Sequence, residues 1–95
     1  MTTVLITSRV AGYDVWRPEC DRALAADWTS PIRAHRVGRG QDDPNLVIVE
    51  QGFDSREVAE AFASSSTLRE AMGRAGVDAS AVQINFLDEV AAGTR

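Results

Sequence analysis

The chain has 95 residues, and 44% of them are hydrophobic, which is typical of one globular domain spanning residues 1–95. Ten basic residues against fourteen acidic ones leave a net charge of −4, and the scattered arginines argue against a nucleic-acid partner. No apolar run approaches the roughly 20 residues that a membrane-spanning helix needs, so no membrane association is expected. A single cysteine excludes an intramolecular disulfide, and the polar start without a signal-like stretch predicts a cytoplasmic protein.

The first part of the chain predicts a strand followed by an amphipathic helix. The β-branched residues of 4–10 form the expected strand, which ends at Ala11-Gly12. Apolar residues at three- and four-residue spacing then predict a helix over 14–26. Asp14 is its expected N-cap, and Pro18 is expected near the first turn, where few intrahelical donors are needed.

The middle of the chain predicts a β-hairpin with a long loop. Residues 32–37 form a second and more polar strand, which stops at 38–40. Turn-forming residues fill 41–45 and lead into the strongly strand-like run 46–50. Because residues 46–49 are all apolar, this third strand is expected to be covered on both faces.

The last part predicts a helix in two pieces. Asp54, with a glutamate three residues later, has the pattern of a capping box, so it is the expected N-cap. Serines at 64–66 interrupt the helix before Thr67 repeats the capping pattern, and Gly76 ends the second piece. A final strand is expected over 81–87, and residues 91–95 are expected to be a frayed tail.

These elements follow the order βαββαβ, which predicts an α+β, ferredoxin-like fold with a four-stranded antiparallel sheet. If the helices cover one face of the sheet, the other face still carries apolar residues. At about 25 cal/mol per Å² of buried apolar surface, a copy of the chain would stabilise that face by several kcal/mol. We therefore expect a homodimer that forms through the sheet face.

His35 is the only histidine, and its ordinary pKa near neutrality makes it the first candidate for general acid or base catalysis, with Arg33 beside it. Arg9, Arg33 and Arg36 are candidates for stabilising an enolate or carboxylate, because a guanidinium offers fixed, paired donors. The alternative, which is the more common situation, is that His35 lies on an exposed strand without a catalytic role and that the arginines are solvated strand residues.

Aromatic residues gather around the first helix. Tyr13, Trp16 and Trp28 are candidates for holding a planar substrate. As an alternative, Tyr13 and Trp16 are core residues on the apolar face of the first helix, which leaves Trp28 as the better ligand candidate. Cys20 lies on the same apolar helix face and is expected to be a structural thiol. The acidic loop 41–45 lacks the spacing of a calcium loop, so no metal is expected.

Six segments carry a family resemblance: 13–18, 36–39, 42–45, 53–55, 68–72 and 75–77. They are similar to segments of small bacterial proteins of the dimeric α+β barrel superfamily, which are related to the antibiotic biosynthesis monooxygenases and are often described as cyclases. The resemblance implies a pocket between sheet and helices that holds a flat, apolar molecule. No catalytic motif of that superfamily transfers residue by residue, and fold alone does not assign a reaction.

Three functions remain open from the sequence. The leading one is a cofactor-independent enzyme, of cyclase, isomerase or monooxygenase type, that acts on an aromatic or polyketide-like substrate. The second is a non-catalytic module that binds a small molecule or serves as a dimeric scaffold. The third is a haem-handling protein, for which His35 is the only histidine available as axial ligand.

Overall fold

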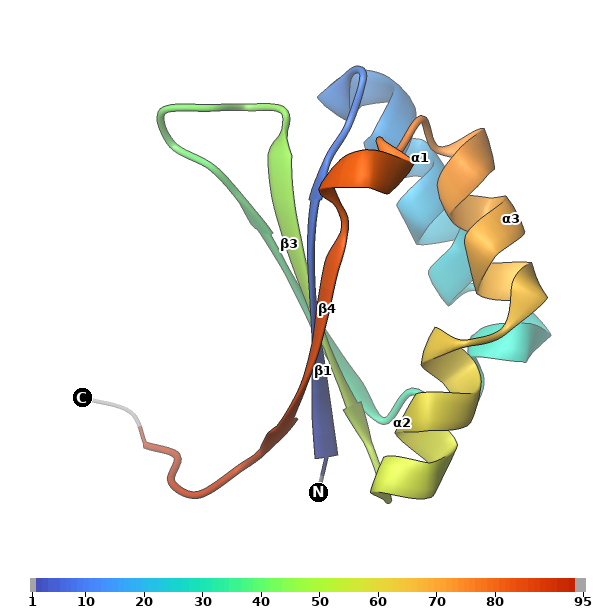
Figure 1. Cartoon of the computed structure of the whole chain (residues 1–95), viewed down its shortest axis with the longest axis vertical. Helices are drawn as coiled ribbons and strands as arrows, with labels where there is room; N and C mark the ends of the chain where they lie inside the picture. The colour runs from blue at the N-terminus through green and yellow to red at the C-terminus, as the bar shows by residue number, and fades with distance from the viewer. Residues whose placement is uncertain (1, 94–95) are drawn as a thin grey trace.

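Residues 2–93 of the computed structural model form one antiparallel sheet with all helices on one of its faces (Figure 1). The elements are β1 (Thr2–Arg9), α1 (Tyr13–Leu24), η1 (Asp27–Thr29), β2 (Ala34–Arg39), β3 (Leu46–Phe53), α2 (Arg56–Ala63), α3 (Ser66–Arg74), η2 (Ala79–Ala81) and β4 (Gln83–Asp88). The strands lie in the order β2-β3-β1-β4, and all neighbours are antiparallel. The predicted ferredoxin-like α+β fold is therefore confirmed.

Strand alternation places the core between the sheet and the helices. Alternate residues of the two central strands are buried under the helices, among them Val4 of β1 with Val47 and Phe53 of β3. The register pairs Ile6 directly with Val49, so the two strands present their buried side chains side by side. These residues belong to one hydrophobic cluster with the inner sides of the helices.

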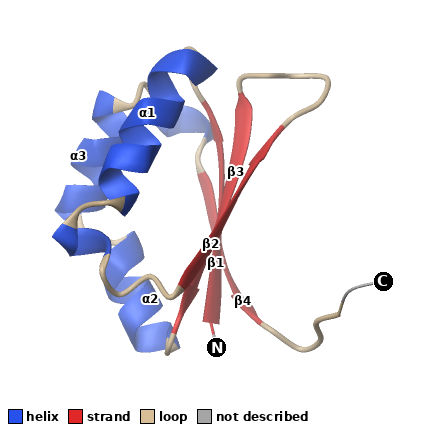
Figure 2. Cartoon of the chain, turned by 180° about the vertical axis from the view of Figure 1, so that it is seen from behind, coloured by secondary structure: helices blue, strands red, loops and turns tan. Residues whose placement is uncertain are grey.

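The opposite face of the sheet is not covered by any described helix (Figure 2). Leu5, Ile48 and Leu87 belong to this open face, and Ile48 is 37% exposed. The expectation that the third strand is covered on both faces is thus wrong for the isolated chain. The stretch after β4 leaves the sheet on this open side (Figure 1) and has no helix or strand up to residue 93; residues 94–95 of the predicted tail lie outside the described residues.

Each predicted helix start is corrected by the structure. Gly12, and not Asp14, is the N-cap of α1; Asp14 lies in the first turn, where its carboxylate still faces the positive end of the helix. Because β3 continues to Phe53, the cap of α2 moves from Asp54 to Ser55, whose Oγ accepts from the Val58 N–H at 3.3 Å.

The two-part helix is confirmed, although its second cap is Ser65 and not Thr67. Ser65 Oγ accepts from the Leu68 N–H at 3.2 Å and donates to the carbonyl of Phe62 at 2.9 Å. This serine therefore ends α2 and begins α3. Gly76 has a φ of +78°, which confirms it as the residue that stops the second helix.

Other boundaries also shift. α1 runs through Pro18, because only one intrahelical bond is lost there. β2 begins at Ala34, because the N–H of Ile32 still bonds back to the carbonyl of Thr29 in the preceding turn. β4 begins at Gln83, because a short helical turn capped by Asp78 precedes it. None of the helices within residues 2–93 is long and apolar enough to cross a membrane.

Candidate functional site

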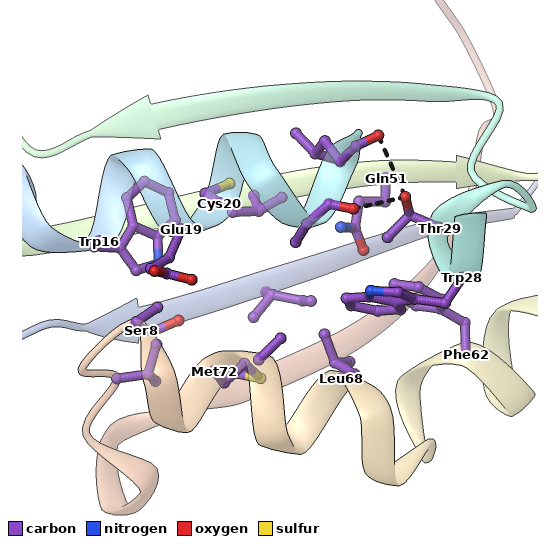
Figure 3. Close-up of a pocket in the computed structure, with 17 residues that line it drawn as sticks. Ser8, Trp16, Glu19, Cys20, Trp28, Thr29, Gln51, Phe62, Leu68 and Met72 are labelled. Atoms are coloured by element: carbon purple, nitrogen blue, oxygen red, sulfur yellow. Dashed lines mark hydrogen bonds between the residues drawn. The ribbon is translucent and has the colours of Figure 1, made fainter. Parts of the chain in front are cut away.

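A cavity of about 70 Å³ lies in the seam between α1 and α3, above the sheet (Figure 3). Its floor comes from the two central strands, with Ile6 and Ser8 from β1 and Val49 and Gln51 from β3. Its walls are side chains of the helices, and most of its lining is apolar. A concave, mainly apolar site with a few polar groups is the usual form of a small-molecule pocket.

The two tryptophans of the chain lie at the two ends of this cavity (Figure 3). Trp28 stacks on Phe62, with the ring centres 5.7 Å apart and the planes at 13°. Trp16 is buried and points from α1 toward the end of the cavity where Ser8 lies. Of the three aromatic residues expected to hold a planar ligand, Trp16 and Trp28 therefore lie in the cavity wall, and they also contribute to the core.

Three buried polar residues line the cavity, and they differ in how they are hydrogen-bonded. The hydroxyl of Thr29 donates to backbone carbonyls at the end of α1, with the Ala23 oxygen at 2.8 Å. Ser8 is buried at the inner position of β1. The Oε1 atom of Gln51 is buried and has no hydrogen-bond partner among the described residues. Buried polar atoms are rarely left in this state, so Gln51 marks a polar point in the floor of the site.

Glu19 and Cys20 supply the ionisable side chains of the lining. Burial raises the pKa of the Cys20 thiol, and the neighbouring carboxylate of Asp21 raises it further. The thiol is therefore protonated at neutral pH and is a poor nucleophile, as the sequence predicted for a structural cysteine. Glu19 forms an ion pair with Arg22 of the same helix, and in Figure 3 its carboxylate lies at the Trp16 end of the cavity.

His35 is not among the residues that line this cavity. It lies exposed on the edge strand β2, although the register places it directly opposite Gln51. Arg33, the second predicted catalytic residue, is also exposed and forms an ion pair with Asp54 at 2.9 Å. This hydrogen-bonded carboxylate raises the pKa of the Arg33 guanidinium. The structure thus keeps both residues away from the cavity, and their catalytic roles stay predictions.

The other predicted binding residues are also engaged elsewhere. Tyr13 lies under the guanidinium of Arg39, whose carbon is 3.9 Å from the ring centre. Arg9 forms an ion pair with Asp43 in the β2–β3 loop. Arg36 points to the open face of the sheet, where its Nε is 4.0 Å from a carboxylate oxygen of Glu50. None of these three side chains lines the α1–α3 cavity.

α3 is a weakly supported wall of the cavity. α2 packs directly on β1, β3 and β4, whereas α3 has the cavity on one flank and a second apolar groove of about 460 Å³ on the other. Leu68 and Met72 of α3 separate the two spaces, since both residues line both of them. A helix with hollows on both flanks has few contacts to lose when it moves.

The size of the cavity limits what it holds in this conformation. A cavity of about 150 Å³ is known to accept benzene, and the present one measures about 70 Å³. An aromatic ligand would therefore require an outward shift of the wall. Within residues 2–93, no group of three histidine, cysteine, aspartate or glutamate side chains is placed to hold a metal ion.

Sequence reasoning missed the polar part of this site. Ser8 and Gln51 occupy inward positions on strands whose other inward residues are mostly apolar. A polar residue at such a position is the signal that would have identified them, because strand alternation alone predicts that it faces the core. The sequence gives no comparable indication for Glu19, because a glutamate at its position is typical of an exposed helix residue.

No family model matches the sequence, and no curated protein does. Solved structures match at low identity. A variant of SnoaB, described as a cofactor-independent oxygenase from Streptomyces nogalater, has a TM-score of 0.74 and 11% identity, with 96% of this chain and 94% of that chain covered. A structure described as an antibiotic biosynthesis monooxygenase has a TM-score of 0.68 and 11% identity, covering 96% of this chain and 100% of that one.

A third match is a dimeric ferredoxin-like protein of unknown function from Jannaschia sp. CCS1, with a TM-score of 0.64 and 15% identity over 94% of this chain and 100% of that one. The structural neighbours are thus the ferredoxin-like proteins that the sequence resemblance predicted. At identities this low, the structural matches establish the shared fold alone, and function has to be argued from the site.

Proposed function

We propose that this protein is a cofactor-independent enzyme that acts on an aromatic or polyketide-like small molecule in the α1–α3 cavity. The observation that carries the proposal is the cavity itself, an apolar space with Trp16 and Trp28 at its ends and Gln51 in its floor. Flat aromatic walls hold flat apolar ligands well, and a few polar groups fix their orientation. The reaction type is a cyclisation, an isomerisation or an oxygenation.

Ligand entry requires more space than the resting cavity offers. α3 is the wall that moves in this proposal, because hollows flank it on both sides and Ser64-Ser65 and Gly76 bound it. An outward shift of Leu68 and Met72 would join the cavity to the neighbouring groove. The α1 wall is less suited to this role, since Thr29 ties the end of α1 to the following turn.

Glu19 is the proposed general base. Cyclisation and isomerisation of such substrates begin when a proton leaves an acidic C–H or O–H, and a positioned carboxylate accelerates that transfer. Glu19 supplies the carboxylate in the lining, and Arg22 holds its side chain at the Trp16 end. The predicted roles of His35 and Arg33 are less well supported, because the cavity is lined by neither residue.

A homodimer formed through the open sheet face is part of the proposal. Leu5, Ile48 and Leu87 would be buried in it, and one solved neighbour is described as a dimeric ferredoxin-like protein. Light scattering should give twice the chain mass of 10.3 kDa. Ile48→Glu should yield the single mass, whereas Val58→Glu should not, although Val58 on α2 is as exposed (38% against 37%).

Binding can be tested with the fluorescence of Trp16 and Trp28, because both tryptophans of the chain line the cavity. A panel of hydroxylated naphthalenes and larger polycyclic phenols should quench this emission in a saturable way. Ala71→Leu fills the cavity and should abolish quenching. Ala61→Leu makes the same change on the exposed side of α2 and should leave it intact. Quenching that survives Ala71→Leu would place the ligand elsewhere.

A non-catalytic binding protein is the second candidate function. It is favoured by one observation, that Glu19 is the single carboxylate in a lining that is otherwise apolar or neutral. Incubating each bound ligand with the protein and following its absorbance, with an oxygen electrode in parallel, separates the candidates. Turnover with oxygen uptake indicates an oxygenase, turnover without uptake indicates a cyclase or isomerase, and saturable binding without turnover indicates a carrier.

A further inference from the structure

Gln51 is a buried amide whose acceptor is unused. The residue is 7% exposed, and its Oε1 has no hydrogen-bond partner among the described residues. Leaving a buried acceptor unpaired is unfavourable, because its hydrogen bond to water is lost without a replacement. Figure 3 shows the amide directed into the cavity, near the end closed by Trp28 and Phe62. A group that enters the cavity at this end would therefore meet a free carbonyl oxygen.

The polar neighbours of Gln51 in the cavity are not placed to supply the missing donor. The proton of the Thr29 hydroxyl is directed to backbone carbonyls of the α1 end, with distances of 2.8 Å and 2.7 Å to the Ala23 and Ala26 oxygens. Ser8 lies four residues along β1 from Val4, the residue opposite Gln51. At about 3.3 Å per residue, this separation is about 13 Å. The floor thus has one polar group toward each end and apolar residues between them.

We propose that Gln51 is a specificity-determining residue, which accepts a hydrogen bond from a neutral hydroxyl or N–H group carried by an aromatic or apolar ligand. This inference rests on the proposed function for the location of the ligand and adds the chemical group that the site selects. The apolar surroundings disfavour a charged group there, because no described cavity residue near Gln51 would compensate a charge. A ligand without a donor would leave Oε1 buried and unpaired.

Phenol and toluene form a suitable pair of probes, because they have nearly the same shape and differ in one donor. Their single rings also require the smallest outward shift of α3. Titrations followed by NMR of the ¹⁵N-labelled protein give affinities and show which residues are contacted. Gln51→Met keeps the size of the side chain and removes the amide. Gln41→Met is the matched control, since Gln41 is an exposed residue of the β2–β3 loop and does not line the cavity.

The wild type should bind phenol about tenfold or more tightly than toluene, which is the usual range when a site loses one buried hydrogen bond. Gln51→Met should remove this preference by weakening phenol binding alone, and Gln41→Met should retain it. Equal affinities in the wild type, or a preference that survives Gln51→Met, would overturn the inference while leaving the cavity as the binding site; Oε1 would then be paired with a buried water. If neither probe shifts the cavity residues, the proposed function fails together with the inference.

Discussion

His35 lies directly opposite Gln51 in the β2–β3 ladder, yet Gln51 is buried and His35 is exposed. Both side chains are on the face of the sheet that carries the helices, because directly opposed residues share a face. The difference arises from position in the sheet. β3 lies under the helices, whereas β2 is the edge strand and its residues extend beyond their cover.

His35→Ala should therefore change the free energy of unfolding by less than about 0.5 kcal/mol and leave ligand binding and turnover intact.

Glu19→Gln should lower turnover by about 100-fold or more, as expected for loss of a general base, while ligand quenching persists. Both variants should be compared by urea unfolding and by the substrate assay. Loss of activity in His35→Ala, or a haemin Soret shift that this variant abolishes, would restore a role for the histidine.

Gly76 and Gly73 offer opposite outcomes for the same substitution. Gly76 has a φ of +78°, so Gly76→Ala should destabilise the chain by about 1–2 kcal/mol. Gly73 lies inside α3 with nothing within 4 Å of an added methyl group, so Gly73→Ala should stabilise by about 0.5–1 kcal/mol. Urea unfolding of the two variants checks both signs. Equal effects would contradict the left-handed conformation of Gly76.

Ser65 joins α2 to α3 through two hydrogen bonds of its hydroxyl. Ser65→Ala should lower stability by about 1 kcal/mol, the usual cost of losing an N-cap side chain. Ser66→Ala, one residue later and exposed, is the control and should be nearly neutral. Amide hydrogen exchange should show faster opening of α3 in Ser65→Ala alone. Unchanged exchange in this helix would argue that the cap does not control its movement.

Asp43 should contribute to stability in a pH-dependent way. The hydrogen-bonded Arg9 guanidinium lowers the pKa of this carboxyl below its ordinary value of 3.8, and the backbone N–H of Asn45 lowers it further. A carboxyl with a lower pKa in the folded chain stabilises it above the unfolded pKa, and this contribution disappears as the pH falls through the folded pKa.

Unfolding midpoints measured between about pH 2 and 6 should therefore fall less steeply in Asp43→Asn than in the wild type. Asp42→Asn, the neighbouring substitution in the same loop, serves as the control and should follow the wild type. Identical acid profiles for Asp43→Asn and the wild type would show that the Arg9 ion pair is absent in solution.

The fold was predictable because strand alternation, helix spacing and turn residues agree with one another along this chain. The caps were not, since the choice between Asp54 and Ser55 depends on where β3 stops. That boundary is set by pairing with β1 as far as Thr2, a long-range contact that no local pattern contains.

The site was predictable only in part. Tyr13, Trp16 and Trp28 were expected to gather around the first helix and to hold a planar ligand; the structure places Trp16 and Trp28 in the cavity lining and Tyr13 outside it. Aromatic side chains on one helix face and the following turn share a core, and their binding role stays a prediction. The catalytic role expected for His35 was based only on the ordinary pKa of a histidine side chain, and not on its position in the fold. Whether an edge-strand residue reaches a cavity depends on how far the helices extend over the sheet, and local sequence does not encode that distance.

The polar character of β2 has a consequence for the behaviour of the protein in concentrated solution. An uncovered edge strand exposes backbone donors and acceptors to which a strand of another molecule can bind, and this is a common start of aggregation. In β2 the charged side chains of Arg36 and Arg39, with Gly38 between them, make such an addition unfavourable. Strand addition at the β2 edge of the sheet is thereby disfavoured, which is compatible with the closed homodimer proposed above.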